Sequence, residues 1–508
     1  MDSLQLQEKP SHPMSSKDPV TMNSDHAEHA EANPKLRQQF SKWSLGSLCL
    51  CLMATWEALA SVVTTALNAG ASYHFWQPSQ LRLRLLRLHR FTRQQEACQY
   101  HWVALLAPPK LSRWASWFTG WISCGGQIVL TVSAAFSAGL QLQALVTVNN
   151  PDTYTPERWQ GMLFYWLILA YALVINLWGS RLLAKTNIVA GVIHIAAFVA
   201  MMAVLLAMAP KQTAHFVFVE TTNSSGWSND GISWLVGMLS AVYPFLGYDS
   251  AVHIAEEMSY PSRDVPIAMV GSVLINGIMG LGFCITLLFS IGNLESILTT
   301  PTGFPFIQLL SNVTMSRAGT TILCLAWTSI AIAATSAGIT STSRTAWAFA
   351  RDNALPFSGY FTHIDEKLKV PKRMIICIII AQMLLGLLYL GSSTAFTAVL
   401  SMAVLGMYAS YILPIICMLL YGRKDDSHKP GPFQLGKMGA AINVISIAWL
   451  MLIMVFSTFP NFQPVTAENM NYCIVVMGGW LFFGVIYYYI QGRKNYKGPV
   501  IEVLEMVI

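Results

Sequence analysis

Two carboxylate side chains lie deep inside long apolar runs of this sequence. Glu57 lies near the middle of the run 44–69, and Asp249 lies within the run 231–257. A charge in such a place is costly unless it faces protein or water, so it is by default a candidate functional group. Glu57 could pair with the ammonium group of a solute or carry a proton. The alternative is a structural role, facing a cytosolic cavity or bonded to a neighbouring helix.

Asp249 ends a segment that should interrupt a helix. The segment reads Tyr243-Pro244-Phe245-Leu246-Gly247-Tyr248-Asp249. Proline removes a backbone donor and clashes with the preceding turn, and glycine adds conformational freedom. When a helix breaks in mid-membrane, its freed backbone groups can bind a small polar solute. This stretch is therefore a candidate binding site for such a solute.

Aromatic residues accompany both carboxylates. Trp56 precedes Glu57, and Tyr243, Phe245 and Tyr248 precede Asp249. Aromatic faces attract ammonium groups, quaternary ones included. The N-termini of half-helices offer unpaired amides that suit a carboxylate. For any single ring, packing against lipid or core remains the alternative interpretation.

The composition excludes a soluble globular protein. Of the 508 residues, 54% are hydrophobic and 11% are charged, whereas a soluble domain carries about 25% charged residues. The formal charge of +6 is better explained by Lys and Arg in inner loops than by nucleic-acid binding. No zinc-ligand spacing, P-loop or nucleophile elbow occurs in the sequence. We therefore predict a polytopic membrane protein that is not an enzyme and uses no metal or cofactor.

Eleven apolar runs are long enough to cross a bilayer. They cover roughly 44–69, 117–147, 160–179, 187–209, 231–257, 266–292, 319–341, 374–391, 394–421, 438–459 and 472–491. The polar residues 1–40 predict a disordered cytoplasmic tail. A transmembrane domain then covers 41–495, and a short cytoplasmic tail covers 496–508.

Positive charges gather in alternate loops from residue 117 onward, for example Arg181, Arg263 and Arg423. Loops rich in Lys and Arg stay on the cytoplasmic side, so the C-terminus is predicted to be cytoplasmic. Asn223 and Asn312 begin Asn-X-Ser/Thr sequons in the opposite set of loops. Both are therefore candidate glycosylation sites.

The stretch 71–98 breaks this pattern. Lys110 and the basic tail should both be cytoplasmic, which requires a second span between residues 70 and 110. Residues 81–90 instead read LRLRLLRLHR, and each Arg at mid-bilayer depth costs roughly 2.5–3.5 kcal/mol. One interpretation is a basic amphipathic helix on the membrane surface. The other is a foreign sequence produced by a misjudged splice site or a frameshift.

Several motifs resemble the amino-acid–polyamine–organocation (APC) superfamily, and within it the fungal permeases for GABA, choline and amino acids. They are QYHW at 99–102, FTGW at 118–121, FLGYD at 245–249 with Glu256-Glu257, PSRDVP at 261–266 and SRTAWAFARDNALP at 343–356. The resemblance covers about 41–72 and 99–495. Where members of this family usually carry Gly-Gly before the Gln-Tyr pair, this chain has Ala97-Cys98.

The resemblance implies a fold and a solute site. The fold is an all-α polytopic one, a leucine-transporter-like 5+5 inverted repeat with spans 1 and 6 broken. Members have twelve spans, so about eleven here means that span 2 is missing or replaced by 71–98. The family places its substrate between the two breaks. By that resemblance the site is formed by Ala54, Thr55, Trp56, Glu57, Tyr243, Phe245, Leu246, Gly247, Tyr248 and Asp249.

Other polar residues of the spans have a functional and a structural interpretation. Gln127, with Gly125 and Gly126, could touch substrate or allow close helix packing, and small-residue packing is favoured. Thr335 and Ser336 could contact an ion or substrate, and polar packing is favoured. His253 is expected to be packed rather than to relay protons. Glu256 and Glu257 are expected to form salt bridges with Arg263 or another inner-loop cation. We expect residues 344–356 to form an inner-loop helix that braces the gate.

These observations predict a secondary active transporter that imports a small amine-bearing solute by alternating access. GABA, another amino acid and choline remain alternatives as substrate. Proton coupling is what the resemblance implies, with Glu57, Asp249, Thr335 and Ser336 as candidate coupling residues. The predicted location is a plasma membrane, with the vacuolar membrane as the alternative. The rival hypothesis is a non-transporting or defective permease-like protein, because span 2 is disrupted.

Overall fold

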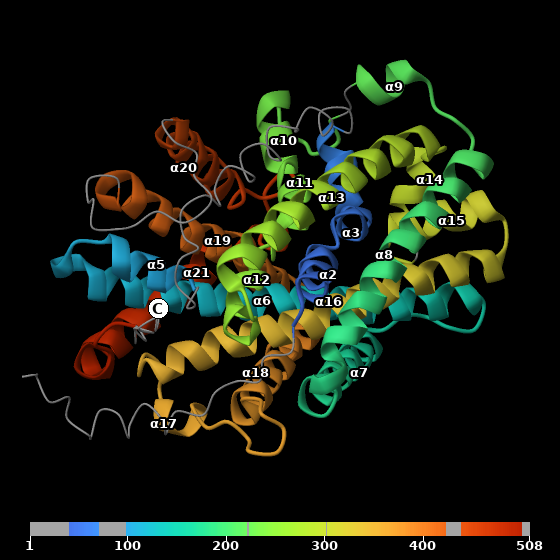
Figure 1. Cartoon of the computed structure of the whole chain (residues 1–508). Helices are drawn as coiled ribbons and strands as arrows, with labels where there is room; N and C mark the ends of the chain where they lie inside the picture. The colour runs from blue at the N-terminus through green and yellow to red at the C-terminus, as the bar shows by residue number, and fades with distance from the viewer. Residues whose placement is uncertain (1–39, 71–97, 221–222, 301, 423–437, 500–508) are drawn as a thin grey trace, which may run out of the picture. The chain divides into compact units, whose positions relative to one another are not determined.

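The computed structural model describes residues 40–70, 98–220, 223–300, 302–422 and 438–499. Within these ranges the regular structure is helical, apart from one isolated bridge between Phe40 and Met258. The longer helices are α2 (Lys42–Met53), α3 (Thr55–Gly70), α6 (Pro109–Asn149), α7 (Arg158–Leu177), α8 (Ser180–Met208), α13 (Pro261–Ser290), α16 (Arg317–Arg351), α18 (Lys372–Gly391), α19 (Ser393–Cys417), α20 (Gly439–Phe456) and α21 (Cys473–Tyr487). The shorter ones are α5 (Gln99–Leu106), α9 (Ala214–Phe218), α10 (Asp230–Gly237), α11 (Leu239–Val242), α12 (Ser250–His253), α14 (Leu294–Leu298), α15 (Pro305–Thr314), α17 (Ser358–Phe361) and α22 (Arg493–Asn495). Figure 1 shows their arrangement.

Eleven segments of the described chain are long and apolar enough to cross a membrane. They coincide with the eleven runs predicted from the sequence, so that prediction is confirmed. Residues 71–97, where the charge pattern requires a further span, lie outside the described residues, as do the tails 1–39 and 500–508. The two interpretations of the Arg-rich stretch therefore both stay open.

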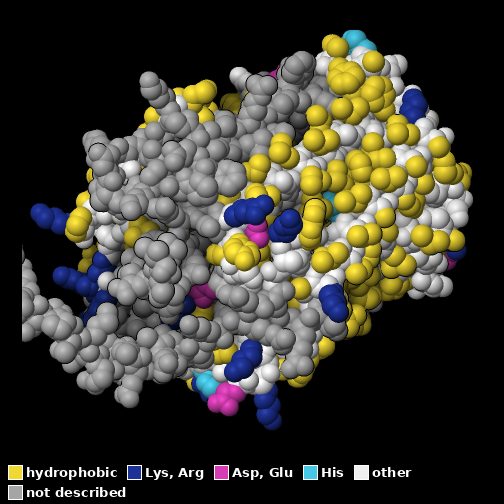
Figure 2. All heavy atoms as spheres, viewed as in Figure 1, with side chains coloured by type: hydrophobic (Ala, Val, Ile, Leu, Met, Phe, Trp, Pro, Cys, Tyr) yellow, Lys and Arg dark blue, Asp and Glu magenta, His cyan; other side chains and the backbone are white. Residues whose placement is uncertain are grey.

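The helices that face outward carry apolar side chains. On α8 these include Val189, Val192 and Val199, and on α13 they include Ile275 and Ile278. Figure 2 shows hydrophobic side chains spread over the side of the molecule where α8 and α13 lie in Figure 1. A surface of this kind is stable against lipid but not against water.

The first span is broken at Ala54. Helix α2 ends at Met53, and Ala54 has φ 40° and ψ 51°, which is the left-handed region. This conformation costs a non-glycine residue roughly 1–2 kcal/mol. Asn276 of α13 offsets the cost: its amide donates to the Leu50 carbonyl (3.2 Å) and accepts from the Thr55 amide (3.3 Å). One side chain thus satisfies backbone groups on both sides of the break.

The span at 231–257 is broken where the sequence predicts it. Helices α10 and α11 are followed by a single 3₁₀ turn at Tyr243–Phe245, and helix resumes only at Ser250 in α12. Gly247 between them has φ +88°, and a Cβ added there would lie 3.0 Å from Cγ of Leu52. Glycine is needed here for its backbone conformation and for the close approach of the first span.

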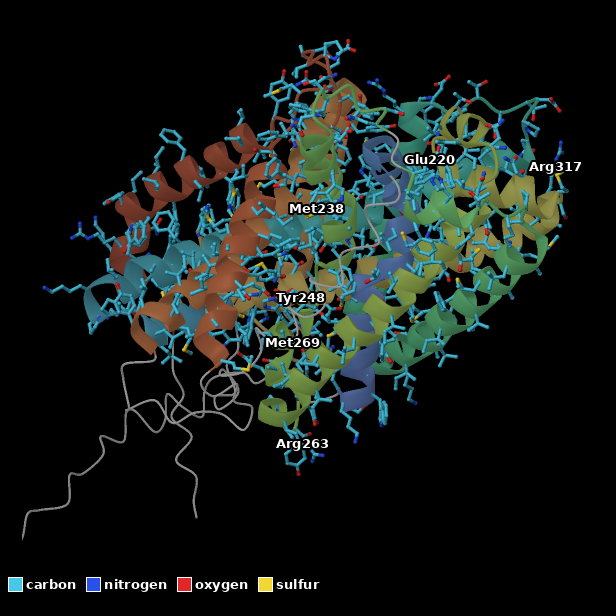
Figure 3. The ribbon with its side chains drawn as sticks, turned by 90° about the horizontal axis from the view of Figure 1, so that it is seen from above. Glu220, Met238, Tyr248, Arg263, Met269 and Arg317 are labelled. Carbon is cyan, nitrogen blue, oxygen red and sulfur yellow. The ribbon has the colours of Figure 1, made fainter. Side chains whose placement is uncertain are left out.

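The two breaks lie side by side. Helix α3 contacts α10, α11 and the 3₁₀ turn, whereas α2 contacts α12, so the two broken spans are antiparallel. The Thr55 hydroxyl donates to the carbonyl of Pro244 across the gap, at 2.9 Å. In Figure 3 Tyr248 lies between Arg263 at one end of the helices and Glu220 and Arg317 at the other. The breaks are therefore at middle depth.

One predicted element is different. No separate helix forms over 344–356, because α16 continues unbroken to Arg351. The side chains of Ser343, Arg344, Thr345 and Phe349 are buried, so the end of this helix is held by the protein around it. Residues 344–351 are the end of a span rather than an inner-loop helix.

Candidate functional site

Glu57 is buried in the first turn of α3, with 2% of its surface exposed. Its Oε1 lies 2.6 Å from Nδ1 of His194 in α8, within hydrogen-bond distance. Oε2 of Glu57 and Nε2 of His194 have no hydrogen-bond partner among the described residues. Sequence reasoning missed His194. The signal that could have found it is a histidine in the middle of the apolar run 187–209.

Two side chains donate hydrogen bonds to the backbone carbonyl of Glu57. Nε1 of Trp327 in α16 donates to the Glu57 carbonyl at 3.2 Å, and the Ser61 hydroxyl donates to the same carbonyl at 3.1 Å. Trp56 is fully buried and packs against Phe283, with ring centroids 5.4 Å apart, and against the ring of His194. Trp56 thus lies on the side of α3 that faces α8 and α13.

Asp249 has a different environment, although it is also buried. Its Oδ1 accepts from the Tyr411 hydroxyl at 2.8 Å, and its Oδ2 accepts from the Gln99 amide at 2.6 Å. Nε2 of His253 lies 3.1 Å from the same Oδ2. Both carboxylate oxygens are therefore bonded within the protein. Asp249 links the broken span to α5 and α19.

His253 and Gln127 extend this network. The Nε2 atoms of the two side chains are 2.5 Å apart, and Oε1 of Gln127 accepts from the Thr345 hydroxyl at 3.1 Å. Nδ1 of His253 lies 3.6 Å from Sγ of Cys98. Burial raises the pKa of the Cys98 thiol well above its ordinary value. It is therefore a neutral thiol here and not a nucleophilic thiolate.

The glycines beside Gln127 bring helices together. A Cβ added to Gly126 would lie 3.0 Å from the backbone nitrogen of Met407 in α19, and one added to Gly125 would overlap the ring of Trp480. Small residues allow such close packing of spans. Gln127 itself points into the Asp249–His253 network.

The aromatic residues at the second break lie in two groups. The Tyr243 hydroxyl is 2.6 Å from the Ser133 hydroxyl of α6. The Tyr248 ring lies 5.3 Å from that of Tyr411. Phe245 is half-buried and packs against the core cluster in which Leu246 is buried. The structure therefore brings Tyr248 and Asp249 together at Tyr411 and leaves Tyr243 and Phe245 half-exposed.

Thr335 and Ser336 in α16 bond to their own helix. The Thr335 hydroxyl donates to the Ala331 carbonyl at 2.9 Å, and the Ser336 hydroxyl donates to the Ile332 carbonyl at 3.4 Å. Hydroxyls that bond back one turn in a span satisfy themselves without a ligand.

Glu256 and Glu257 form ion pairs at the end of the molecule that is predicted to be cytoplasmic. Glu257 lies 2.7 Å from Nε of Arg344, with both side chains buried, and Glu256 lies 3.1 Å from Arg351. The expected salt bridges of these glutamates are thus made with residues of α16. The Phe40 amide also donates to the Glu257 carbonyl at 3.4 Å. The start of the first span is thereby attached to the end of the second broken span.

Helix α5 is held at the same end. The Tyr100 hydroxyl donates to Oδ2 of Asp352 at 2.7 Å. Burial, together with the nearby carboxylate, raises the pKa of Tyr100 well above its ordinary value. The phenol therefore remains a donor to Asp352.

The two sequons differ in their environments. The Asn223 amide donates to the Trp227 carbonyl (2.8 Å) and to Asp230 (2.9 Å). Asn312 lies on an exposed position of α15, where its Oδ1 accepts from Gln308. Glycosylation stays a prediction for both, and it would disrupt more local structure at Asn223.

Comparison with known proteins supports the family resemblance. Residues 92–480 match the family described as amino acid permease. The chain is 30% identical over 492 residues to a choline transporter of Saccharomyces cerevisiae, covering 94% of this chain and 85% of that protein. It is 31% identical over 400 residues to an amino-acid permease of Schizosaccharomyces pombe, covering 78% and 73% of the two chains. It is 28% identical to Amino-acid permease 2 of Neurospora crassa, covering 92% and 87%.

Proposed function

Because the chain belongs to the amino acid permease family, we propose that it carries a small amine-bearing solute across the membrane by alternating access. It is a multi-pass membrane transporter and not an enzyme. The proposed cargo is an amino acid, GABA or choline. The proposed location is a plasma membrane, with the vacuolar membrane as the alternative.

The observation that carries the proposal is the pairing of the two helix breaks. Both breaks are at middle depth, and Thr55 bonds directly to the Pro244 carbonyl across the gap between them. Half-helices that end in mid-membrane expose backbone donors and acceptors for a solute. A continuous packing helix would gain nothing from such breaks, and Ala54 adopts a costly conformation to make one.

The groups around the breaks suit an amine. In this proposal the backbone of Ala54, Thr55, Leu246 and Gly247 lines the site. The half-buried rings of Tyr243 and Phe245 offer aromatic faces for an ammonium group. Tyr248, Asp249, Gln127 and Trp56 shape the site through their internal bonds and packing. Glu57 is not proposed as a solute contact, because its Oε1 already lies 2.6 Å from Nδ1 of His194.

The choice between choline and an amino acid depends on the anion site. A zwitterion needs amide donors for its carboxylate, whereas choline needs only the aromatic and anionic groups. One relative is named a choline transporter and others are named amino-acid permeases. Competition between labelled choline and labelled GABA for uptake into cells expressing the chain distinguishes the two.

The site assignment is tested with Phe245→Ala in the same uptake assay. We expect loss of most uptake, because a ring that closes over the solute is removed. Phe482→Ala on α21 is the matched control, since Phe482 is 68% exposed on the outer surface. Uptake that is equal in the two variants would contradict the assignment.

The Arg-rich stretch favours a second candidate. If 71–98 truly replaces a span, the chain could be a non-transporting product of an altered gene. Sequencing of the mature transcript across the codons for Ala71 to Trp102 tests this. An apolar span in the transcript would restore an ordinary permease. The arginine-rich sequence as written, together with the absence of uptake, would support the second candidate.

A further inference from the structure

The described chain contains two buried pairs of a histidine and a carboxylate, each just beyond a helix break. Glu57 pairs with His194 after the break at Ala54, and Asp249 pairs with His253 after the break at Gly247. The pairs differ in how their remaining atoms are bonded. Both oxygens of Asp249 accept hydrogen bonds from protein groups, and both ring nitrogens of His253 have protein neighbours. Glu57 and His194 each keep one buried polar atom without a partner.

A buried polar group without a partner is costly, so it persists where it has a function or binds something that comes and goes. We propose that the Glu57–His194 pair is the site where the transporter binds and releases its coupling proton, and that the Asp249–His253 pair is structural. This inference deepens the proposed function and rests on it. Neither the family match nor the relatives' names assign a role to His194.

The proton balance follows from the geometry. With neutral His194 donating its Nδ1 proton to Oε1, the pair carries one negative charge. An added proton binds Nε2 of His194 or Oε2 of Glu57, which are the two atoms left open. In either case the pair becomes neutral overall, and the proton leaves again from the same atom. A net charge buried at this depth is unfavourable, so neutralisation by a proton stabilises one state of the carrier over the other.

Other titratable groups surround the Glu57–His194 pair, and the Asp249–His253 pair lies at the second break. Cys51 of α2 is a further titratable side chain that interacts with Glu57. Thiols from α13 and α16, Cys284 and Cys324, belong to the same core as Trp56. The charged residues of α8 and of the elements packed against α3 lie toward the helix ends: Arg181, Lys185, Asp230, Arg263, Asp264, Arg317, Arg344 and Arg351.

The Glu57–His194 pair lies where a movement of the first span relative to α8 would change its contacts. Glu57 lies one helical turn beyond Ala54, the residue at which α2 and α3 change direction. Its partner His194 belongs to α8, which packs against α2. Two states of the first span that differ in the contact with α8 would differ in affinity for the proton, which is what coupling requires.

The experiment uses the full chain, purified and reconstituted in lipid vesicles, with [14C]choline and [14C]GABA as probes. Solute exchange at equal pH on both sides needs no net proton movement. Uphill accumulation under an imposed pH gradient does need it. For Glu57→Gln and His194→Gln we expect exchange to be retained, while accumulation driven by the pH gradient falls by about tenfold or more. His215→Gln is the matched control, because His215 is exposed on α9.

Either variant that accumulates solute in response to pH as the wild type does would overturn the proposal. Loss of exchange in a variant that elutes as the wild type does would assign the pair to solute binding instead, and would also overturn it. If the wild type itself exchanges neither probe, the proposed function has failed rather than this assignment. If the variants do not fold, the proton uptake that the proposal requires is measured in wild-type vesicles that hold a pH dye. An inward solute gradient should acidify the lumen, and an unchanged lumenal pH overturns the proposal.

Discussion

At the scale of single residues, Thr55 and Asn276 maintain the first break. The Thr55 hydroxyl and amide bond to two different spans, and the Asn276 side chain bonds on both sides of Ala54. These bonds replace those that a continuous helix would make. The local sequence around Ala54 does not predict a break, because residues 47–69 contain neither glycine nor proline. The break depends on the side-chain amide of Asn276, which is 221 positions from Thr55 and 226 from Leu50, and only the family resemblance anticipated it.

Thr55→Val tests the link between the breaks. The change removes the donor to the buried Pro244 carbonyl, and we expect the free energy of unfolding to fall by about 1–3 kcal/mol. Thr55→Ser keeps the hydroxyl and is the matched control. Denaturant unfolding of both variants in detergent measures the difference. Equal stability of the two would mean that the bond across the breaks contributes nothing.

Gly247→Ala tests the second break. Alanine would be strained at φ +88°, and its Cβ would press on Leu52, so we expect a loss of about 1–3 kcal/mol. Gly271→Ala in α13 is the control, because a Cβ there meets no atom within 4 Å. Thermal unfolding of the two variants is the measurement. A stable Gly247→Ala protein would show that this backbone conformation is not required.

At the scale of elements, the end predicted to be cytoplasmic is held by contacts between segments far apart in sequence. Arg344 pairs with Glu257, Tyr100 bonds to Asp352, and the Phe40 amide bonds to the Glu257 carbonyl. Together they join α2, α5, the second broken span and α16. Closure of this end on one side of the solute site is what alternating access requires of one of its states. The sequence predicted salt bridges for the glutamates, but their partners depend on how far α16 extends.

Arg344→Gln tests this closure. It removes the ion pair between Nε of Arg344 and Oε1 of buried Glu257, and we expect the free energy of unfolding to fall by about 3–5 kcal/mol. The comparison is Arg351→Gln, whose pair with Glu256 is partly exposed and worth about 0.2–1 kcal/mol. Unfolding by denaturant ranks the two variants. Equal effects, or a larger effect at Arg351, would contradict the buried pair as the main link.

At the scale of the whole molecule, hydropathy alone predicted the eleven spans and the Pro-Gly pattern predicted the second break. These features are local, so a single sequence carries them. The pairing of Glu57 with His194 and the bonds of Asp249 to Gln99 and Tyr411 are not local. They arise because packing brings separate spans together, and no spacing along the chain encodes them. The membrane orientation and the stretch 71–97 remain predictions from charge.

The most direct test of the account is counterflow by the purified full chain, with 71–98 as written. Vesicles loaded with unlabelled choline or GABA are diluted into the labelled solute. We expect transient uptake of label above that of protein-free vesicles for at least one of the two solutes. Uptake equal to that of protein-free vesicles for both solutes would contradict the claim that the paired breaks carry an amine across the membrane.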